Sequence, residues 1–412
     1  MAVGVFPEGR VSVSLSRRRR PIMPDSTRSL RPSWFALLGA LVLSFLLTAC
    51  GGDFRPYAVG PEGEVTVVID STHWNGAVGE ALRTNIGPYV ETLPVAERYF
   101  QFRQFDLNQA IFDEVKKRKN VVIIAPLSDS TNEANFLRRR LSEDARQAVM
   151  NGQVAVVPKP DLWRRSQRVY FITARSAEAL VNALQERGQD VRQTFKRVTL
   201  DRMQQEMFEK ARQQNLEDTL MRDHNFAVNV QHDYQIALQE TTDSTGFVWL
   251  RRVLTDTWRN LIVYYIEDAS ASRISPEWIY TTRDSLTRTY VRGNVAGFMR
   301  IDYRRPLTAQ QTSFEDRYAY EVRGLWHMVA HKDSLDVDSP NRTFLEMGGG
   351  GPFLTYAFYD QASDRIYMVD GAVFAPGYDK LPFLRQMEVI AKTFRTRQEA
   401  SGDASDEAVA QR

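Results

Sequence analysis

The stretch Val121-Val122-Ile123-Ile124-Ala125 decides the fold of the first half of this chain. An unbroken apolar run rich in β-branched residues is typical of a strand buried on both faces, as in parallel sheets covered by helices. Further strands are predicted at Val65–Ile69, Phe100–Phe105 and Val169–Ile172. Because helical patterns separate these strands, residues 64–175 are expected to form an α/β part.

Two of the intervening helices are visible in the spacing of apolar residues. An apolar residue recurs at every fourth position from Trp74 to Ile86, which predicts a helix with one buried face, and Ser71 or Thr72 is expected to cap it. Ser130 and Glu133 have the spacing of a capping box, which predicts that a second helix starts here and carries Phe136, Leu137, Leu141 and Val149.

The second half of the chain has a different pattern. Residues 176–224 predict a pair of bridging helices, and short strands with turn-length gaps follow, as in antiparallel hairpins. Helices over 275–290 and 382–394 are expected to cover this sheet, so residues 225–396 are predicted to be α+β. The fold class is therefore α+β, with an N-terminal α/β part, a helical bridge and a C-terminal mostly antiparallel sheet covered by helices. The predicted strands are 226–230, 234–238, 247–250, 261–266, 297–303, 318–326, 353–359 and 365–374.

Composition excludes several classes of protein. The 412 residues are 43% hydrophobic and 25% charged, which is typical of globular domains and excludes disordered and collagen-like chains. From Cys50 onward the chain has 46 basic and 49 acidic side chains, so it lacks the basic surface that nucleic-acid binding requires. A single cysteine excludes an internal disulfide.

A targeting segment precedes residue 51. Arg28 and Arg31 come before an apolar run of about 14 residues, 34–47, which is shorter than the roughly 20 residues that span a bilayer. The run ends in Leu47-Thr48-Ala49-Cys50, which resembles a bacterial lipobox. That resemblance implies that residues 23–49 are a lipoprotein signal peptide and that the Cys50 thiol receives diacylglycerol, with acylation of the new amine. Several acyl chains hold a protein on a membrane much more firmly than one chain.

The segments on both sides of this signal peptide, and the C-terminal segment, are interpreted from their composition. Residues 1–22, with four consecutive arginines at 17–20, are interpreted as a mis-assigned upstream start, and the alternative is a basic nucleic-acid-binding arm. Residues 50–63 mix glycine, proline and charge and are expected to be a tether. Residues 397–412 are expected to be a disordered tail. The residue after Cys50 is not Asp, and by resemblance to enterobacterial sorting this favours the outer membrane.

Several motifs resemble a known family. Met347-Gly348-Gly349-Gly350-Gly351-Pro352-Phe353, Asp370-Gly371-Ala372-Val373-Phe374, and Lys380 with Leu384–Glu388 are similar to the C-terminal block of a Bacteroidota lipoprotein family known as domain of unknown function 4837 (DUF4837). The resemblance continues through Trp74, Lys119-Asn120 and Phe247–Arg251, so it spans nearly all of Cys50–Phe394. It departs from the family pattern in a longer glycine run. The family name implies a location and an architecture, but no catalytic residue, ligand or cofactor.

The glycine run Gly348, Gly349, Gly350 and Gly351 is the sharpest local feature. Exposed amides of such a run can bind anions, but a phosphate loop also needs a helix start or a following Lys-Ser/Thr, whereas Pro352-Phe353 enters a strand. A tight or bulged turn is the simpler interpretation. For both the anion-binding and the turn interpretation, we expect another part of the molecule or a ligand to pack close to the backbone of these glycines.

Other candidate residues have a functional and a structural interpretation. Asp70 and His73 follow the first strand, where α/β folds place ligand sites, and an acid beside a histidine can form a general base. The structural interpretation is that Asp70 belongs to a loop that caps the next helix.

Trp163 is the most loop-like tryptophan and a candidate partner contact, although most aromatic residues pack in cores. His327 and His331 are four apart, but a strand pattern surrounds them and argues against zinc. Arg304-Arg305 is expected to be a solvated surface.

No set of residues in the sequence indicates a specific catalysed reaction. The sequence therefore predicts a lipid-anchored cell-envelope protein with a non-enzymatic binding or assembly role, with no cofactor or metal, and with an envelope protein or a glycan as partner. A third option is small-ligand capture, with the glycine turn at Gly348–Gly351 lining the pocket. The alternative is an envelope enzyme that acts on glycan or cell-wall material through carboxylates such as Asp70 or Glu80.

Overall fold

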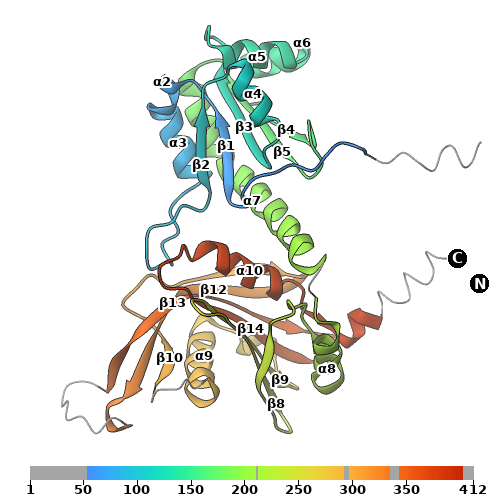
Figure 1. Cartoon of the computed structure of the whole chain (residues 1–412), viewed down its shortest axis with the longest axis vertical. Coiled ribbons are helices and arrows are strands. Elements are labelled where there is room, and N and C mark those ends of the chain that lie inside the picture. The colour runs from blue at the N-terminus through green and yellow to red at the C-terminus, as the bar shows by residue number, and fades with distance from the viewer. Residues whose placement is uncertain (1–52, 210–211, 292–296, 335–342, 402–412) are drawn as a thin grey trace, which may run out of the picture. The chain divides into compact units, whose positions relative to one another are not determined.

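A computed structural model describes residues 53–209, 212–291, 297–334 and 343–401 (Figure 1). Helices make up 35% and strands 36% of it, which confirms the α+β class. Residues Arg55–Arg412 form one compact unit, so the two lobes described below belong to a single body. The leader, Cys50 and residues 1–22 lie outside the described residues. No helix of the described chain is long and apolar enough to cross a membrane.

The N-terminal lobe contains a five-stranded sheet in the order β2-β1-β3-β5-β4, parallel except for β4 (Figure 1). β3 is buried at every position, as its apolar run predicts. Apolar side chains of α3 and α7 pack on one face of the sheet, and those of α4, α5 and α6 pack on the other. The elements are β1 Glu64–Val68, α2 Ser71–Trp74, α3 Ala77–Asn85, β2 Gln101–Phe105, α4 Gln109–Val115, β3 Asn120–Pro126, α5 Asn132–Arg140, α6 Glu143–Met150, β4 Val156–Pro160 and β5 Arg168–Ala174.

Three local predictions in this lobe are wrong in detail. The helix expected over 74–86 is broken into α2 and α3, and Asp70 rather than Ser71 or Thr72 caps α2. The helix expected after residue 130 is capped by Thr131 and ends before Leu141, and Ser142 then caps α6. α3 starts after Gly76, which has no capping side chain, whereas the Ser142 side chain caps α6. The apolar spacing reveals neither break.

Part of the expected tether also lies against the N-terminal lobe. Tyr57 and Val59 form single bridges to Arg165 and Arg118, and Ala58 is buried. At the other end of the chain, residues 397–401 are helical, and Glu399 forms an ion pair with Arg317. Residues 57–59 and Glu399 therefore contact the folded chain, although the sequence assigned them to a tether and a tail.

The C-terminal lobe is an antiparallel sheet in the order β10-β12-β13-β14-β9-β8-β7, with β11 paired to β12. Side chains of α8 and α10 pack on one face together with the end of α7, and α9 packs on the other face. The small pair β6 and β15 lies outside this sheet. The elements are α7 Ala177–Glu209, α8 Gln214–His224, β6 Phe226–Ala227, β7 Gln235–Thr241, β8 Thr245–Val253, β9 Trp258–Glu267, η1 Ala271–Arg273, α9 Pro276–Tyr290, β10 Phe298–Ile301, β11 Thr308–Phe314, β12 Arg317–His331, η2 Lys332–Ser334, β13 Phe344–Asp360, β14 Arg365–Phe374, α10 Leu381–Ala391 and β15 Arg395–Thr396.

A buried polar network joins the two lobes. Glu388 of α10 lies 2.7 Å from Lys196 Nζ of α7 and 2.9 Å from Arg323 Nη2 of β12, and Arg323 also pairs with Glu321 at 2.7 Å. Glu97, from the loop before β2, accepts hydrogen bonds from the amides that start α10. These contacts fix the N-terminal lobe to the helix that covers the C-terminal sheet.

Candidate functional site

The carboxyl ends of the parallel strands gather the first of the predicted site residues. The chain leaves β1 toward β2 and leaves β3 toward β5 on the other side, so the switch point of this sheet lies between β1 and β3. His73 follows β1, Asp129 follows β3, and His73 Nε2 lies 2.5 Å from Asp129 Oδ2. Asp70 instead accepts a hydrogen bond from the Thr72 amide at 2.9 Å. The structure therefore pairs His73 with Asp129, whereas Asp70 serves as a helix cap.

Two more carboxylates lie near this edge, and both are held by local hydrogen bonds. Asp106 accepts from the hydroxyl and the amide of Ser71, each at 2.7 Å, and these hydrogen bonds, the hydroxyl's first, lower its pKa. Burial raises the pKa of Glu133, which accepts from the Leu107 amide instead of closing the predicted capping box. The arrangement suits hydrogen bonding or proton transfer by His73. Glu80, the other carboxylate of the enzyme hypothesis, is exposed on α3.

The glycine run lies in a bulged part of β13. Gly348 and Gly349 have φ of +74° and +83°, and the register between β12 and β13 shifts between His327 and Val329. A Cβ on Gly350 would lie 2.6 Å from the carbonyl oxygen of Trp326, and one on Gly351 would lie 1.9 Å from that of Val373. The structure therefore has the bulge of the simpler interpretation, and backbone does pack close to these glycines.

Gly349–Gly351 line a cavity of about 600 Å³, which we name the glycine cavity. Its walls come from both lobes and from several strands of the C-terminal sheet. Its volume lies within the usual range of small-ligand sites, roughly 300–1,000 Å³. The remaining lining residues are Pro94, Asp302, Arg304, Arg305, Leu325, Trp326, His327, Phe374, Pro376 and Lys380.

The cationic side chains of the glycine cavity are of two kinds. Arg304 is paired with Asp302 at 2.7 Å and with Glu346. Arg305 donates a long hydrogen bond to the Pro94 carbonyl, 3.4 Å, and the Lys380 ammonium donates to the Tyr378 carbonyl. In the part of the chain that the structure describes, neither Arg305 nor Lys380 has a carboxylate partner. These two cations therefore line the cavity without an ion-pair partner in the described chain. The expectation that Arg304-Arg305 is only a solvated surface is thus incomplete.

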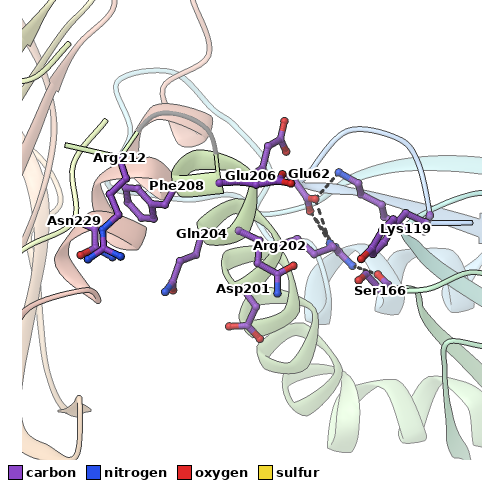
Figure 2. Close-up of a pocket in the computed structure, with 14 residues that line it drawn as sticks. Glu62, Lys119, Ser166, Asp201, Arg202, Gln204, Glu206, Phe208, Arg212 and Asn229 are labelled. Atoms are coloured by element: carbon purple, nitrogen blue, oxygen red, sulfur yellow. Dashed lines mark hydrogen bonds and ion pairs between the residues drawn. The ribbon is translucent and has the colours of Figure 1, made fainter. Parts of the chain in front are cut away.

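A larger cavity, about 900 Å³, lies elsewhere (Figure 2). Figure 2 shows Lys119 and Arg202 pointing toward Glu62, whose carboxylate lies 2.5 Å from Lys119 Nζ and 3.0 Å from Arg202 Nη2. Arg202 also donates to the Ser166 carbonyl. Because Lys119 and Arg202 are already paired with Glu62, and Arg212 with Glu217, an anionic ligand would have to displace an existing ion pair. We therefore favour the smaller glycine cavity as the binding site.

The other candidate residues from the sequence make packing or polar contacts within the fold. Trp163, in the turn between β4 and β5, is half-buried and packs edge-to-face on Phe112 with ring centroids 5.5 Å apart. His327 lies beside Arg304, and His331 lies 3.1 Å from Asp333. Among the described residues, no group of three or more His, Cys, Asp or Glu side chains is placed to hold a metal ion.

Sequence reasoning missed most of the lining of the glycine cavity. Arg305, Trp326 and Lys380 are far apart in the chain and meet only through sheet pairing and the lobe junction. The available signal was the glycine run itself, which indicates a close approach of backbone segments.

In comparisons with known proteins, the two lobes match different family models. The model of Domain of unknown function (DUF8532) matches residues 58–208, and no curated protein matches the chain. A Saccharomyces cerevisiae Ran-binding protein, Mog1p, is similar at 13% identity and a TM-score of 0.25, covering 42% of this chain and 90% of that one, too weakly to establish a shared fold. The N-terminal motifs at Trp74 and Lys119-Asn120, assigned above to DUF4837, thus fall within the DUF8532 match. Residues 213–393 match the model of Domain of unknown function (DUF4837), which confirms the predicted family for the C-terminal lobe.

Proposed function

We propose that this protein is a lipid-anchored cell-envelope protein that acts as a binding or assembly module, with the glycine cavity as its ligand site. The observation that carries the proposal is a preformed cavity that bears two cations without carboxylate partners among the described residues. The anchor is proposed from the lipobox at Cys50, and the outer membrane is the proposed location.

The construction of the cavity supports binding to a rigid site. Gly350 and Gly351 hold β13 against the backbones of β12 and β14 with no space for a Cβ atom. Pro94 comes from the N-terminal lobe, which Glu97 and Glu388 fix to α10. A preorganised site avoids the free-energy cost of ordering mobile groups on binding. Anchoring at Cys50 would further raise the effective concentration near other envelope components.

Replacing Cys50 by Ala is expected to move the protein from the membrane fraction to the soluble fraction, because the acyl chains supply the membrane affinity. The measurement is immunoblotting of separated inner-membrane, outer-membrane and soluble fractions. An unchanged distribution would contradict the anchor, and an inner-membrane location of the wild type would contradict the proposed membrane.

The binding role is tested by crosslinking in membranes followed by mass spectrometry. The wild type is compared with Cys50→Ala and with the double variant Arg305→Glu/Lys380→Glu, which reverses the cavity charge. The matched control is Arg187→Glu on the exposed surface of α7. We expect a stoichiometric envelope partner or glycan adduct with the wild type and the control, and its loss with the double variant. Equal recovery from all four proteins would reject the glycine cavity as the site.

A second candidate function is an envelope enzyme, favoured by the pairing of His73 with Asp129 across the switch point of the sheet. If this edge is catalytic, His73→Gln should abolish release of soluble fragments from purified cell-wall material without reducing stability by more than about 1 kcal/mol, because the pair is partly exposed. If the binding proposal is right, wild type and His73→Gln should both release nothing.

A further inference from the structure

Two buried side-chain nitrogens of residues that line the glycine cavity have no hydrogen-bond partner in the described chain. Trp326 is 3% exposed, and its indole Nε1 has no hydrogen-bond partner among the described residues. This nitrogen lies beside the cavity-lining backbone of Gly351, since a Cβ built there would be 3.5 Å from it. An indole N–H can only donate, and a buried donor without an acceptor is costly. We therefore infer that the indole N–H of Trp326 donates to an acceptor atom of a bound ligand.

The second donor follows from the tautomer of His327. Its Nδ1 lies 3.3 Å from Nη2 of Arg304, and a guanidinium can only donate, so Nδ1 must be the unprotonated nitrogen. Burial lowers the pKa of His327, which keeps the ring neutral at pH 7. The proton of the neutral ring therefore lies on Nε2, which is buried and has no partner among the described residues. His327 thus offers an unused N–H as well, but on the face of β12 opposite to that of Trp326, so Trp326 supplies the donor to the ligand.

Two cationic side chains also line the cavity, in addition to the N–H donors. Arg305 and Lys380 line the same cavity without carboxylate partners in the described chain, and the carboxylate of Asp302 is already held by Arg304. Acceptors with negative charge form the strongest hydrogen bonds with N–H donors and attract both cations. This combination selects an oxyanion over a neutral acceptor such as a hydroxyl group.

The rest of the lining is apolar and suits a ring. Leu325, Pro376 and the ring of Phe374 border the cavity, and Phe374 lies between the rings of Trp326 and Trp258, with centroids 6.3 Å and 4.9 Å away. Small-ligand sites combine such apolar walls with a few placed polar groups. A bare inorganic anion would leave these walls unused.

We propose that the glycine cavity binds a small molecule that carries an oxyanion, most simply a carboxylate, on a ring-shaped body, as an acidic sugar does. This inference rests on the proposed function, because it names the ligand class of the same cavity. Arg305 and Lys380 attract the oxyanion, the indole N–H of Trp326 donates to one of its oxygens, and Phe374 packs on the ring.

The test is calorimetric titration of the full chain in detergent with three probes: glucuronate, glucose and inorganic phosphate. Glucose keeps a sugar ring without the charge, and phosphate keeps the charge without the ring. We expect glucuronate to bind at least tenfold more tightly than glucose and to weaken as salt is raised. Phosphate binding as tight as that of glucuronate would keep the oxyanion but reject the ring. Equal binding of glucose and glucuronate, or no binding of either anion, would overturn the proposal.

Variants assign the binding to this cavity. Arg305→Ala/Lys380→Ala changes side chains at the cavity rim, and Trp326→Phe removes the indole N–H while keeping an aromatic ring. Each is expected to weaken glucuronate binding about tenfold or more, whereas Arg187→Ala, on an exposed surface, should not change it. If Trp326→Phe does not fold, the double variant still decides the question. A crosslinked partner without glucuronate or phosphate binding would overturn the ligand class but leave the binding function standing.

Discussion

Replacing Glu388 by Gln is expected to lower the free energy of unfolding by about 3–5 kcal/mol. Glu388 is buried between the lobes, and its carboxylate contacts the cations of Lys196 and Arg323. Neutralising it leaves the two partly buried cations with Glu321 as the neighbouring counter-charge. Breaking one partner of a buried network is costly because the other charges stay out of water. Urea unfolding of wild type and variant at pH 7 measures the difference.

The matched control is Glu143→Gln. Glu143 also pairs with an arginine, Arg146, but this pair is exposed on α6, so its loss should change stability by less than about 0.5 kcal/mol. Equal losses for the two variants would contradict the claim that burial makes the Glu388 contacts important. Such a result would also remove the main argument for a fixed junction beside the glycine cavity.

The same network predicts how stability depends on pH. Burial alone would raise the pKa of Glu388, but the charges of Arg323 and Lys196 outweigh it and hold this pKa well below its usual value of 4.5. A carboxyl with a lowered folded-state pKa stabilises the protein above its unfolded pKa and loses that contribution as pH falls toward the folded value. The difference between wild type and Glu388→Gln should therefore be largest near pH 7 and narrow below about pH 4. A difference that stays constant to pH 3 would contradict this origin.

The sequence predicted strands better than it predicted breaks and edges. β3 contains an unbroken apolar run and β14 is mostly apolar, so local composition is enough to identify them. β4 and β11 are polar or proline-containing strands at sheet edges, and they were missed because partial exposure leaves no clear alternation. The order of strands in each sheet depends on pairing between distant segments, which no local pattern encodes.

Those parts of the candidate site that are marked by a rare local sequence feature could be predicted from the sequence. His73 and the glycine run were found because a histidine after a buried strand and consecutive glycines are rare local features. Asp129 was missed because its contact with His73 crosses from one strand end to another. Arg305 and Lys380 were missed because charge near a strand end is ordinary until the fold brings two such residues to one cavity.

Replacing Gly351 by Ala is expected to lower the free energy of unfolding by about 3 kcal/mol or more and to abolish ligand binding in the glycine cavity. The added Cβ would lie 1.9 Å from the carbonyl oxygen of Val373, a backbone atom that a side-chain rotation cannot move. Relief requires β13 to move away from β14, and this movement displaces the wall beside Trp326. Thermal unfolding and glucuronate titration of the same preparation measure both effects.

Gly348→Ala separates steric overlap from backbone conformation. Gly348 has φ of +74° and nothing within 4 Å of an added Cβ, so its replacement should cost about 1 kcal/mol through the left-handed conformation alone. Because Gly348 does not line the cavity, binding should persist in this variant. If Gly348→Ala and Gly351→Ala lose equal stability, the glycines serve only the bulge. A larger loss for Gly351→Ala, with loss of binding, would mean that the close approach of β13 to β14 builds the cavity wall.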